Sequence, residues 1–145
     1  MRICFDMDGT IANLYGVKGW LEMLIAHDET PYRLATTLVN MNTLARYLNK
    51  LQKRGYEIGI ISWLAKNSTQ EYDENVTRAK KNWLKKHLRS VKFDFVEIVA
   101  YGTDKNIVAV EKTDILFDDE EKNRNNWAGV AYDADNILET LRGLM

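Results

Sequence analysis

The chain has 145 residues, of which 46% are apolar and 28% are charged, and its 20 basic and 21 acidic side chains leave a net charge of −1. This length suits a single domain, and an apolar chain with so small a net charge is not a disordered one. No stretch approaches 18 uninterrupted apolar residues, which excludes a membrane-spanning helix, and the charge balance argues against a general polyanion-binding protein.

The first predicted element is a strand over residues 2–5, where the apolar residues are continuous. The next segment, residues 13–42, does not fit a regular pattern of strands and helices. Within it, residues 20–26 could form a short helix, and Pro31 could start another, since proline is favoured in the first helical turn. We interpret residues 13–42 as an insertion over the carboxyl edge of a sheet; an irregular connection is the alternative.

A helix follows over residues 43–54, because its apolar side chains fall on one face and Gly55 follows at the position that glycine favours after a helix. Residues 56–61 predict a second strand. Residues 69–88 predict a long charged helix with a stripe of apolar side chains. Residues 93–99 predict a third strand, again apolar and rich in β-branched and aromatic residues.

The remaining elements are a short helix over residues 104–110, strands over 113–117 and 129–132, and a helix over 136–144. All five strand segments are mostly continuous apolar runs, which is typical of strands buried on both faces. Strands that alternate with helices predict a parallel sheet with right-handed crossovers. We therefore expect a doubly wound, Rossmann-like α/β domain of about five strands.

Cysteine content and the first residues predict the compartment. Cys4 is the only cysteine, so no intrachain disulfide can form, and its apolar neighbours indicate a core position. Asp6 interrupts the chain too early for the apolar stretch of a signal peptide. We expect a cytoplasmic protein.

The strongest motif follows the first strand and reads Phe5-Asp6-Met7-Asp8-Gly9-Thr10. Carboxylates two positions apart in extended backbone point the same way, and Gly9 allows the chain to turn sharply afterwards. Crowded carboxylates favour a hard cation such as Mg²⁺. An acidic turn without a ligand is the alternative, because Asp-Gly is a common turn dipeptide.

Three more polar features follow the other strands. Ser62 ends the second strand, Lys105 follows the third, and Asp118 and Asp119 end the fourth. The carboxyl ends of strands are where open α/β sheets bind ligands. Each residue also has an ordinary explanation, as a helix cap or a solvated side chain. Together they form an ordered set: an acid pair, a hydroxyl, a lysine and a second acid pair.

This ordered set resembles the haloacid dehalogenase-like (HAD) superfamily of phosphotransferases. The resemblance extends over nearly the whole chain, with Asp6-Met7-Asp8-Gly9-Thr10 as the first motif and Ser62, Lys105 and Asp118-Asp119 as the other three. The segment Leu116-Phe117-Asp118-Asp119-Glu120 is also similar to small magnesium-dependent phosphatases and 5′(3′)-deoxyribonucleotidases of this superfamily. The resemblance implies hydrolysis of a phosphomonoester, with a nucleotide as a candidate substrate, through an aspartyl-phosphate intermediate.

The resemblance also implies a role for each residue. Asp6 would be the nucleophile and Asp8 the general acid and base, while Ser62 and Lys105 would contact the phosphoryl oxygens. The implied Mg²⁺ ligands are the Asp6 carboxylate, the Asp8 backbone carbonyl and one acid of the fourth motif.

Asp119 is the ligand that we favour from the fourth motif, with Asp118 behind it near Lys105, although the sequence does not distinguish the two. Gly9 and Thr10 would bind phosphoryl oxygens through their amides.

Residues 13–42 would then be a minimal cap, too short for a cap domain. Tyr15, Trp20 and Tyr32 in this segment, with Trp63 beside Ser62, could stack on a ring of the substrate; packing against the core is the alternative. We therefore expect a small phosphorylated substrate, and the sequence predicts no oligomeric state.

Other interpretations remain open. A polynucleotide 3′-phosphatase or a phosphoprotein phosphatase would use an open site and the basic side chains near the long helix. The alternative for those side chains is a solvated face, and they are Arg78, Lys80, Lys81, Lys85, Lys86, His87 and Arg89. A phospho-receiver module would carry its adjacent acids after the first strand, whereas here they follow the fourth. A P-loop kinase lacks its motif here.

Overall fold

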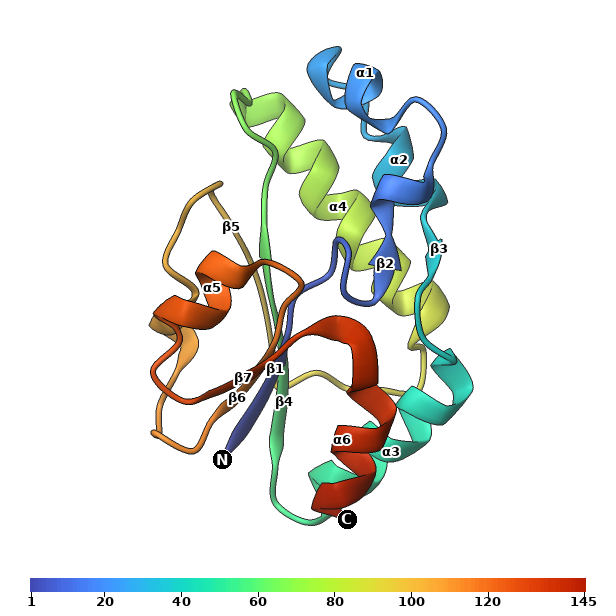
Figure 1. The fold of residues 1–145 in the computed structure, drawn as a ribbon. Coiled ribbons are helices and arrows are strands. Elements are labelled where there is room, and N and C mark those ends of the chain that lie inside the picture. The colour runs from blue at the N-terminus through green and yellow to red at the C-terminus, as the bar shows by residue number, and fades with distance from the viewer.

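A five-stranded parallel sheet forms the centre of the computed structural model, which describes all 145 residues (Figure 1). The strand order is β5-β4-β1-β6-β7, so the chain starts in the middle of the sheet and builds outward in both directions. The five strands are β1 (Arg2–Phe5), β4 (Glu57–Trp63), β5 (Phe95–Val99), β6 (Ile115–Phe117) and β7 (Val130–Tyr132). Each overlaps its predicted run, and the doubly wound α/β prediction is confirmed.

Helices cover both faces of this sheet. The helices α3 (Met41–Lys53), α4 (Gln70–His87) and α6 (Ile137–Leu144) pack on one face, and the 3₁₀ turn η2 (Lys105–Val108) and α5 (Glu121–Asn126) lie on the other (Figure 1). Successive side chains of a strand alternate between the faces. Accordingly, Ile3 and Phe5 belong to the larger core cluster under α3, α4 and α6, whereas Cys4 belongs to the smaller one opposite.

Local signals explain where the main helices begin. The Asn40 side chain accepts a hydrogen bond from the Thr43 amide at 3.1 Å, and Thr69 does the same for the Tyr72 amide at 3.2 Å. The helix predicted over 104–110 is only the 3₁₀ turn η2. Ile107 and Val110 are exposed, so this segment has too little apolar surface to stabilise a longer helix.

The insertion between β1 and α3 stands above the carboxyl edge of the sheet (Figure 1). Its elements are β2 (Ala12–Asn13), η1 (Leu14–Gly16), α1 (Trp20–Ile25), α2 (Thr30–Leu34) and β3 (Thr36–Thr37). Both predicted short helices are present, and Pro31 lies in the first turn of α2. The antiparallel pairing of β2 with β3, which closes the insertion at its base, was not predicted.

A small core of its own holds the insertion on α4. It comprises Leu14, Tyr32, Tyr72, Val76 and Ala79. No helix in the structure is long and apolar enough to cross a membrane.

Candidate active site

The site is built on a tight loop that follows β1. The Asp6 amide continues the strand pairing by donating to the Phe117 carbonyl at 2.9 Å, and the Met7 carbonyl then accepts from three successive amides. Gly9 has a φ of +80°, which side chains rarely adopt, and a Cβ there would lie 2.2 Å from the Asp119 carboxylate. The loop therefore needs glycine in order to bring β1 and β6 residues together.

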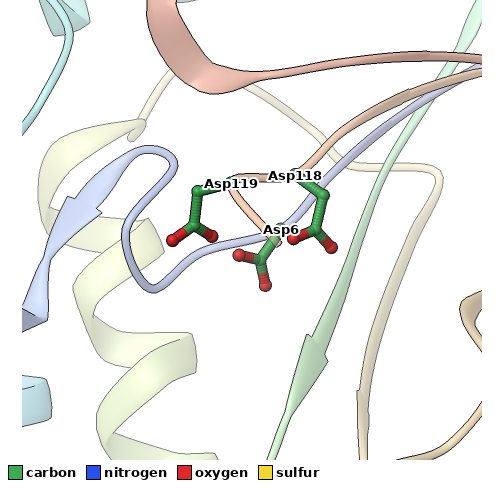
Figure 2. Close-up of side chains that lie close together, drawn as sticks. All are labelled: Asp6, Asp118 and Asp119. Atoms are coloured by element: carbon green, nitrogen blue, oxygen red, sulfur yellow. The ribbon is translucent and has the colours of Figure 1, made fainter. Parts of the chain in front are cut away.

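Three carboxylates converge at this point. Ligand oxygens of Asp6, Asp118 and Asp119 all lie within 4.8 Å of one another. Figure 2 shows Asp6, at the end of β1, flanked by the two acids that follow β6. Adjacent strands end side by side, so acids 112 positions apart in the chain meet without any long loop. This is a donor set that a hard divalent cation prefers.

Lys105 is the cationic partner of two of these acids. Its side chain is only 3% exposed, and Nζ donates to Asp6 Oδ1 at 2.8 Å and to Asp118 Oδ2 at 2.6 Å. Burial alone would lower the pKa of Lys105, but the Asp6 and Asp118 carboxylates raise it above its usual value. The lysine is therefore charged, and it links Asp6 of the first motif to Asp118 of the fourth.

Asp118 and Asp119 differ in how far their oxygens are already used. Asp118 Oδ2 accepts from Lys105 and from Asn123 Nδ2, and Asp118 Oδ1 accepts from the Glu120 amide at 2.9 Å. The Asp119 carboxylate has only the Thr10 hydroxyl as a partner, at 3.3 Å. Asp119 consequently has the greater capacity to bind a cation.

Crowding also shifts the protonation of the two acids. Burial, and then the nearby Asp6 carboxylate, raise the pKa of Asp118 to about 6 and that of Asp119 to about 7. Such shifts are expected when several carboxylates are desolvated together. A cation among them would relieve this repulsion.

The amides of Gly9 and Thr10, which the resemblance assigns to phosphate binding, have partners within the turn. Their amides donate to the carbonyls of Ala12 and Met7 within the turn. The Thr10 side chain is fully buried, and its hydroxyl lies 3.0 Å from Asp6 Oδ2 and accepts from the Asp119 amide at 3.2 Å. The structure therefore places Thr10 between two acids, because the turn consumes its amide and its hydroxyl faces inward.

Lys80 is the residue that sequence reasoning missed. We expected it on a solvated basic face, but it is 1% exposed, and Nζ donates to Asp8 Oδ2 at 2.9 Å and to Ser62 Oγ at 2.7 Å. A periodicity signal was available: position 80 lies four residues after Val76 and three before Trp83, on the apolar stripe of α4. The neighbouring Arg78 and Lys81 are exposed, as expected.

Ser62 lies near the end of β4, as predicted. Its side chain is fully buried, and its hydroxyl oxygen accepts a hydrogen bond from Lys80. Lys80 Nζ donates to the Ser62 hydroxyl oxygen, which leaves the Ser62 O–H as a donor, and contact of Ser62 with a phosphate stays a prediction. Asp8, in contrast, lines the cavity.

A cavity of about 320 Å³ opens over the acids. Its floor carries Asp6, Asp8, Lys105, Asp118 and Asp119. Its walls combine the insertion with the ends of β4 and β5, and their aromatic members are Tyr15, Trp20, Tyr32, Trp63 and Tyr101.

Two aromatic pairs line this cavity. Tyr15 and Trp20 meet edge to face at 4.9 Å, and Trp63 and Tyr101 lie 5.0 Å apart. The Trp63 indole N–H donates to the Thr103 carbonyl at 2.8 Å, which fixes the ring as a wall. The four aromatic residues singled out from the sequence all line the cavity, and they are Tyr15, Trp20, Tyr32 and Trp63.

The charge of the site suits a divalent cation. Four carboxylates share it with two buried ammonium groups, which leaves an excess of two negative charges, and Asp119 has no cationic partner. Burying unpaired charge is costly. The residues present thus fit a resident divalent metal ion.

No protein-family model matches the sequence, and no curated protein is significantly similar to it. Among solved structures, the chain is similar to D,D-heptose 1,7-bisphosphate phosphatase from Burkholderia thailandensis. The likeness covers 99% of this chain and 97% of that one, with a TM-score of 0.55 and 10% sequence identity. The chain therefore shares its Rossmann-like α/β fold with that phosphatase.

Proposed function

We propose that the protein is a Mg²⁺-dependent phosphatase that hydrolyses a small phosphomonoester through an aspartyl-phosphate intermediate. The observation that carries the proposal is the convergence of Asp6, Asp118 and Asp119 with Lys105 at the carboxyl edge of the sheet. A fold shared with a sugar bisphosphate phosphatase supports it.

The metal ion would be held by Asp6, Asp119 and the Asp8 backbone carbonyl. Asp118 would not bind the metal ion directly and would instead pair with Lys105. The free oxygens of Asp119 and the saturated ones of Asp118 support this division. When bound, the cation would neutralise charge on the phosphoryl oxygens and so reduce their repulsion of the nucleophile.

The protein's own groups account for the bond changes. A carboxylate oxygen of Asp6 forms a bond to phosphorus while the ester P–O bond breaks, and Asp8 gives its proton to the departing oxygen. Water then attacks phosphorus, Asp8 takes its proton, and Asp6 is released. Lys105 holds Asp6 and adds positive charge beside the phosphoryl group.

Thr10 and Ser62 position the reacting groups through hydrogen bonds. In our proposal Thr10 keeps Asp6 and Asp119 apart at a fixed spacing, and Ser62 contributes through Lys80. Gly9 serves the reaction by allowing the turn.

The cavity suggests the class of leaving group. Trp63, Tyr101, Tyr15 and Trp20 offer flat apolar faces above the acids, which suits a base or another planar ring, so a nucleotide is the substrate that we favour. The segment 13–42 would act as a minimal cap. A sugar phosphate is the second candidate, since the similar phosphatase acts on a heptose bisphosphate.

Phosphate release from an aryl phosphate tests the proposal. Activity should require Mg²⁺, disappear with a chelator, and fall to background in Asp6→Asn, whereas the exposed Asp135→Asn should match the wild type. A fully active Asp6→Asn protein would contradict the nucleophile assignment. A panel of nucleotides, sugar phosphates and 3′-phosphorylated oligonucleotides then separates the substrate classes.

A further inference from the structure

Lys80 makes a set of contacts that no surface role explains. Its Nζ has three protons, and all three have acceptors: Asp8 Oδ2 at 2.9 Å, Ser62 Oγ at 2.7 Å and the Trp63 carbonyl at 2.6 Å. The side chain is 1% exposed and does not line the cavity. Lysines are almost never this buried unless they are paired.

The three acceptors connect separate parts of the site. Asp8 belongs to the loop after β1, Ser62 and Trp63 end β4, and Lys80 comes from the middle of α4. Lys80 Nζ also lies 5.0 Å from the ring centre of Tyr32, which belongs to the insertion. One ammonium group therefore meets the loop, the sheet edge and the insertion at once.

The hydrogen bonds to Ser62 and to the Trp63 carbonyl fix the position of the Lys80 ammonium group. The hydrogen bond from Lys80 to Asp8 then fixes the orientation of the Asp8 carboxylate. Because Lys80 occupies Oδ2 of Asp8, Oδ1 is left as the oxygen able to carry a proton. A charge-assisted bond of this kind is stronger and more directional than a neutral one. The orientation of Asp8 is thus determined by a side chain 72 positions away in the chain.

We propose that Lys80 is a positioning residue, which acts through Asp8 and aims its proton at the oxygen that leaves phosphorus. This inference rests on the proposed function, in which Asp8 is the general acid. Lys80 does not line the cavity and makes no hydrogen bond to Asp6, so it differs in role from Lys105.

The test compares leaving groups in Lys80→Met, which keeps the length of the side chain and removes its charge. An alkyl phosphate needs a proton on its departing oxygen, whereas 4-nitrophenyl phosphate does not. We expect kcat/KM, which covers the steps up to departure of the alcohol and excludes the later hydrolysis of the aspartyl-phosphate, to fall about 10²-fold for the alkyl ester. For the aryl ester we expect kcat/KM to fall at most about threefold, since general-acid catalysis contributes little to the loss of 4-nitrophenolate.

Two comparisons make the result specific. The exposed Lys81→Met on the same helix should behave as the wild type with both esters. In an Asp8→Asn background, adding Lys80→Met should cost no further activity, because the residue through which Lys80 acts is already lost. The double variant removes both charges of the pair and therefore remains foldable if Lys80→Met alone leaves Asp8 unpaired and unstable.

The outcomes separate this inference from the proposed function. Equal losses in kcat/KM with both esters, or a further loss in the double variant, would overturn the role of Lys80 and leave the phosphatase proposal standing. A wild-type protein without phosphatase activity on any ester would overturn both.

Discussion

At the scale of single residues, the buried polar side chains of this protein are stabilised by their hydrogen bonds. Lys80, Lys105 and Asp118 are buried polar groups, and each has hydrogen-bond partners that compensate its burial. Asp114 follows the same rule away from the site. Its carboxylate accepts from the amides of Arg2 at 2.7 Å, Val110 at 2.7 Å and Glu111 at 2.9 Å. It thereby joins the N-terminus to the loop before β6.

Asp114→Asn should destabilise the fold by about 1–3 kcal/mol, because an amide NH₂ group would face an N–H donor and leave it unsatisfied. Urea denaturation at pH 7 measures the change. Burial alone would raise the pKa of Asp114, but its three amide donors hold that pKa below its usual value.

The sign of the pH dependence follows from this lowered pKa. A carboxyl whose pKa is lower in the folded state contributes stability above its unfolded pKa of about 4, and that stability is lost as the pH falls through the folded pKa. The stability gap between wild type and Asp114→Asn should therefore be constant near neutral pH and shrink below about pH 4. A gap that widens in acid would contradict this role.

At the scale of elements, the site depends on close approach between neighbouring strands and loops. Gly9 lets the loop after β1 pass beside Asp119, and Gly59 in β4 leaves room for the ring of Phe95 in β5. A Cβ on Gly59 would lie 2.1 Å from that ring. The centre of the Phe95 ring in turn lies 4.7 Å from the guanidinium of Arg2 in β1. The lack of a side chain at Gly59 therefore allows residues of three strands to pack together.

Gly59→Ala should destabilise the protein by about 1–3 kcal/mol, since overpacking forces the ring or the backbone to move. Gly143 in α6 provides the matched control, because a Cβ there meets no atom within 4 Å. Gly143→Ala should stabilise the fold by about 0.5–1 kcal/mol through helix propensity. Thermal unfolding of both variants checks the pair, and equal effects would show that packing at Gly59 is not tight.

For the whole molecule, near-neutral net charge conceals a strongly acidic site. The chain as a whole carries −1, yet the site gathers four carboxylates with two ammonium groups. Repulsion among these acids works against folding in the metal-free protein, and a bound cation reverses that contribution. Stability and metal binding are therefore coupled.

Mg²⁺ should raise the melting temperature at pH 7.5, and a chelator should lower it. A free concentration a hundredfold above Kd stabilises by about 2.7 kcal/mol, and each kcal/mol is worth about 2–4 °C for a domain of this size. The shift should vanish in Asp119→Asn and persist in Asp135→Asn. An equal shift in Asp119→Asn would remove Asp119 from the metal ligands.

Much of the fold and of the outline of the site could be predicted from the sequence. Continuous apolar runs identify buried strands, and Asp6, Lys105 and Asp118 each follow such a run, so a parallel sheet must bring them to one edge. This prediction needs only the local chain and the rule that parallel strands end on the same side.

The tertiary structure alone decided which partners those residues have. Lysine is usually exposed, so the sequence assigns Lys80 to the solvent even though its position falls on the apolar stripe of α4, and only the tertiary structure shows that Asp8 and Ser62 are its partners. The same holds for the different environments of Asp118 and Asp119, which adjacent letters in a sequence cannot distinguish. Side-chain type and spacing determine the chemistry that can gather at the sheet edge, whereas distances between elements far apart in the chain determine which group acts on which.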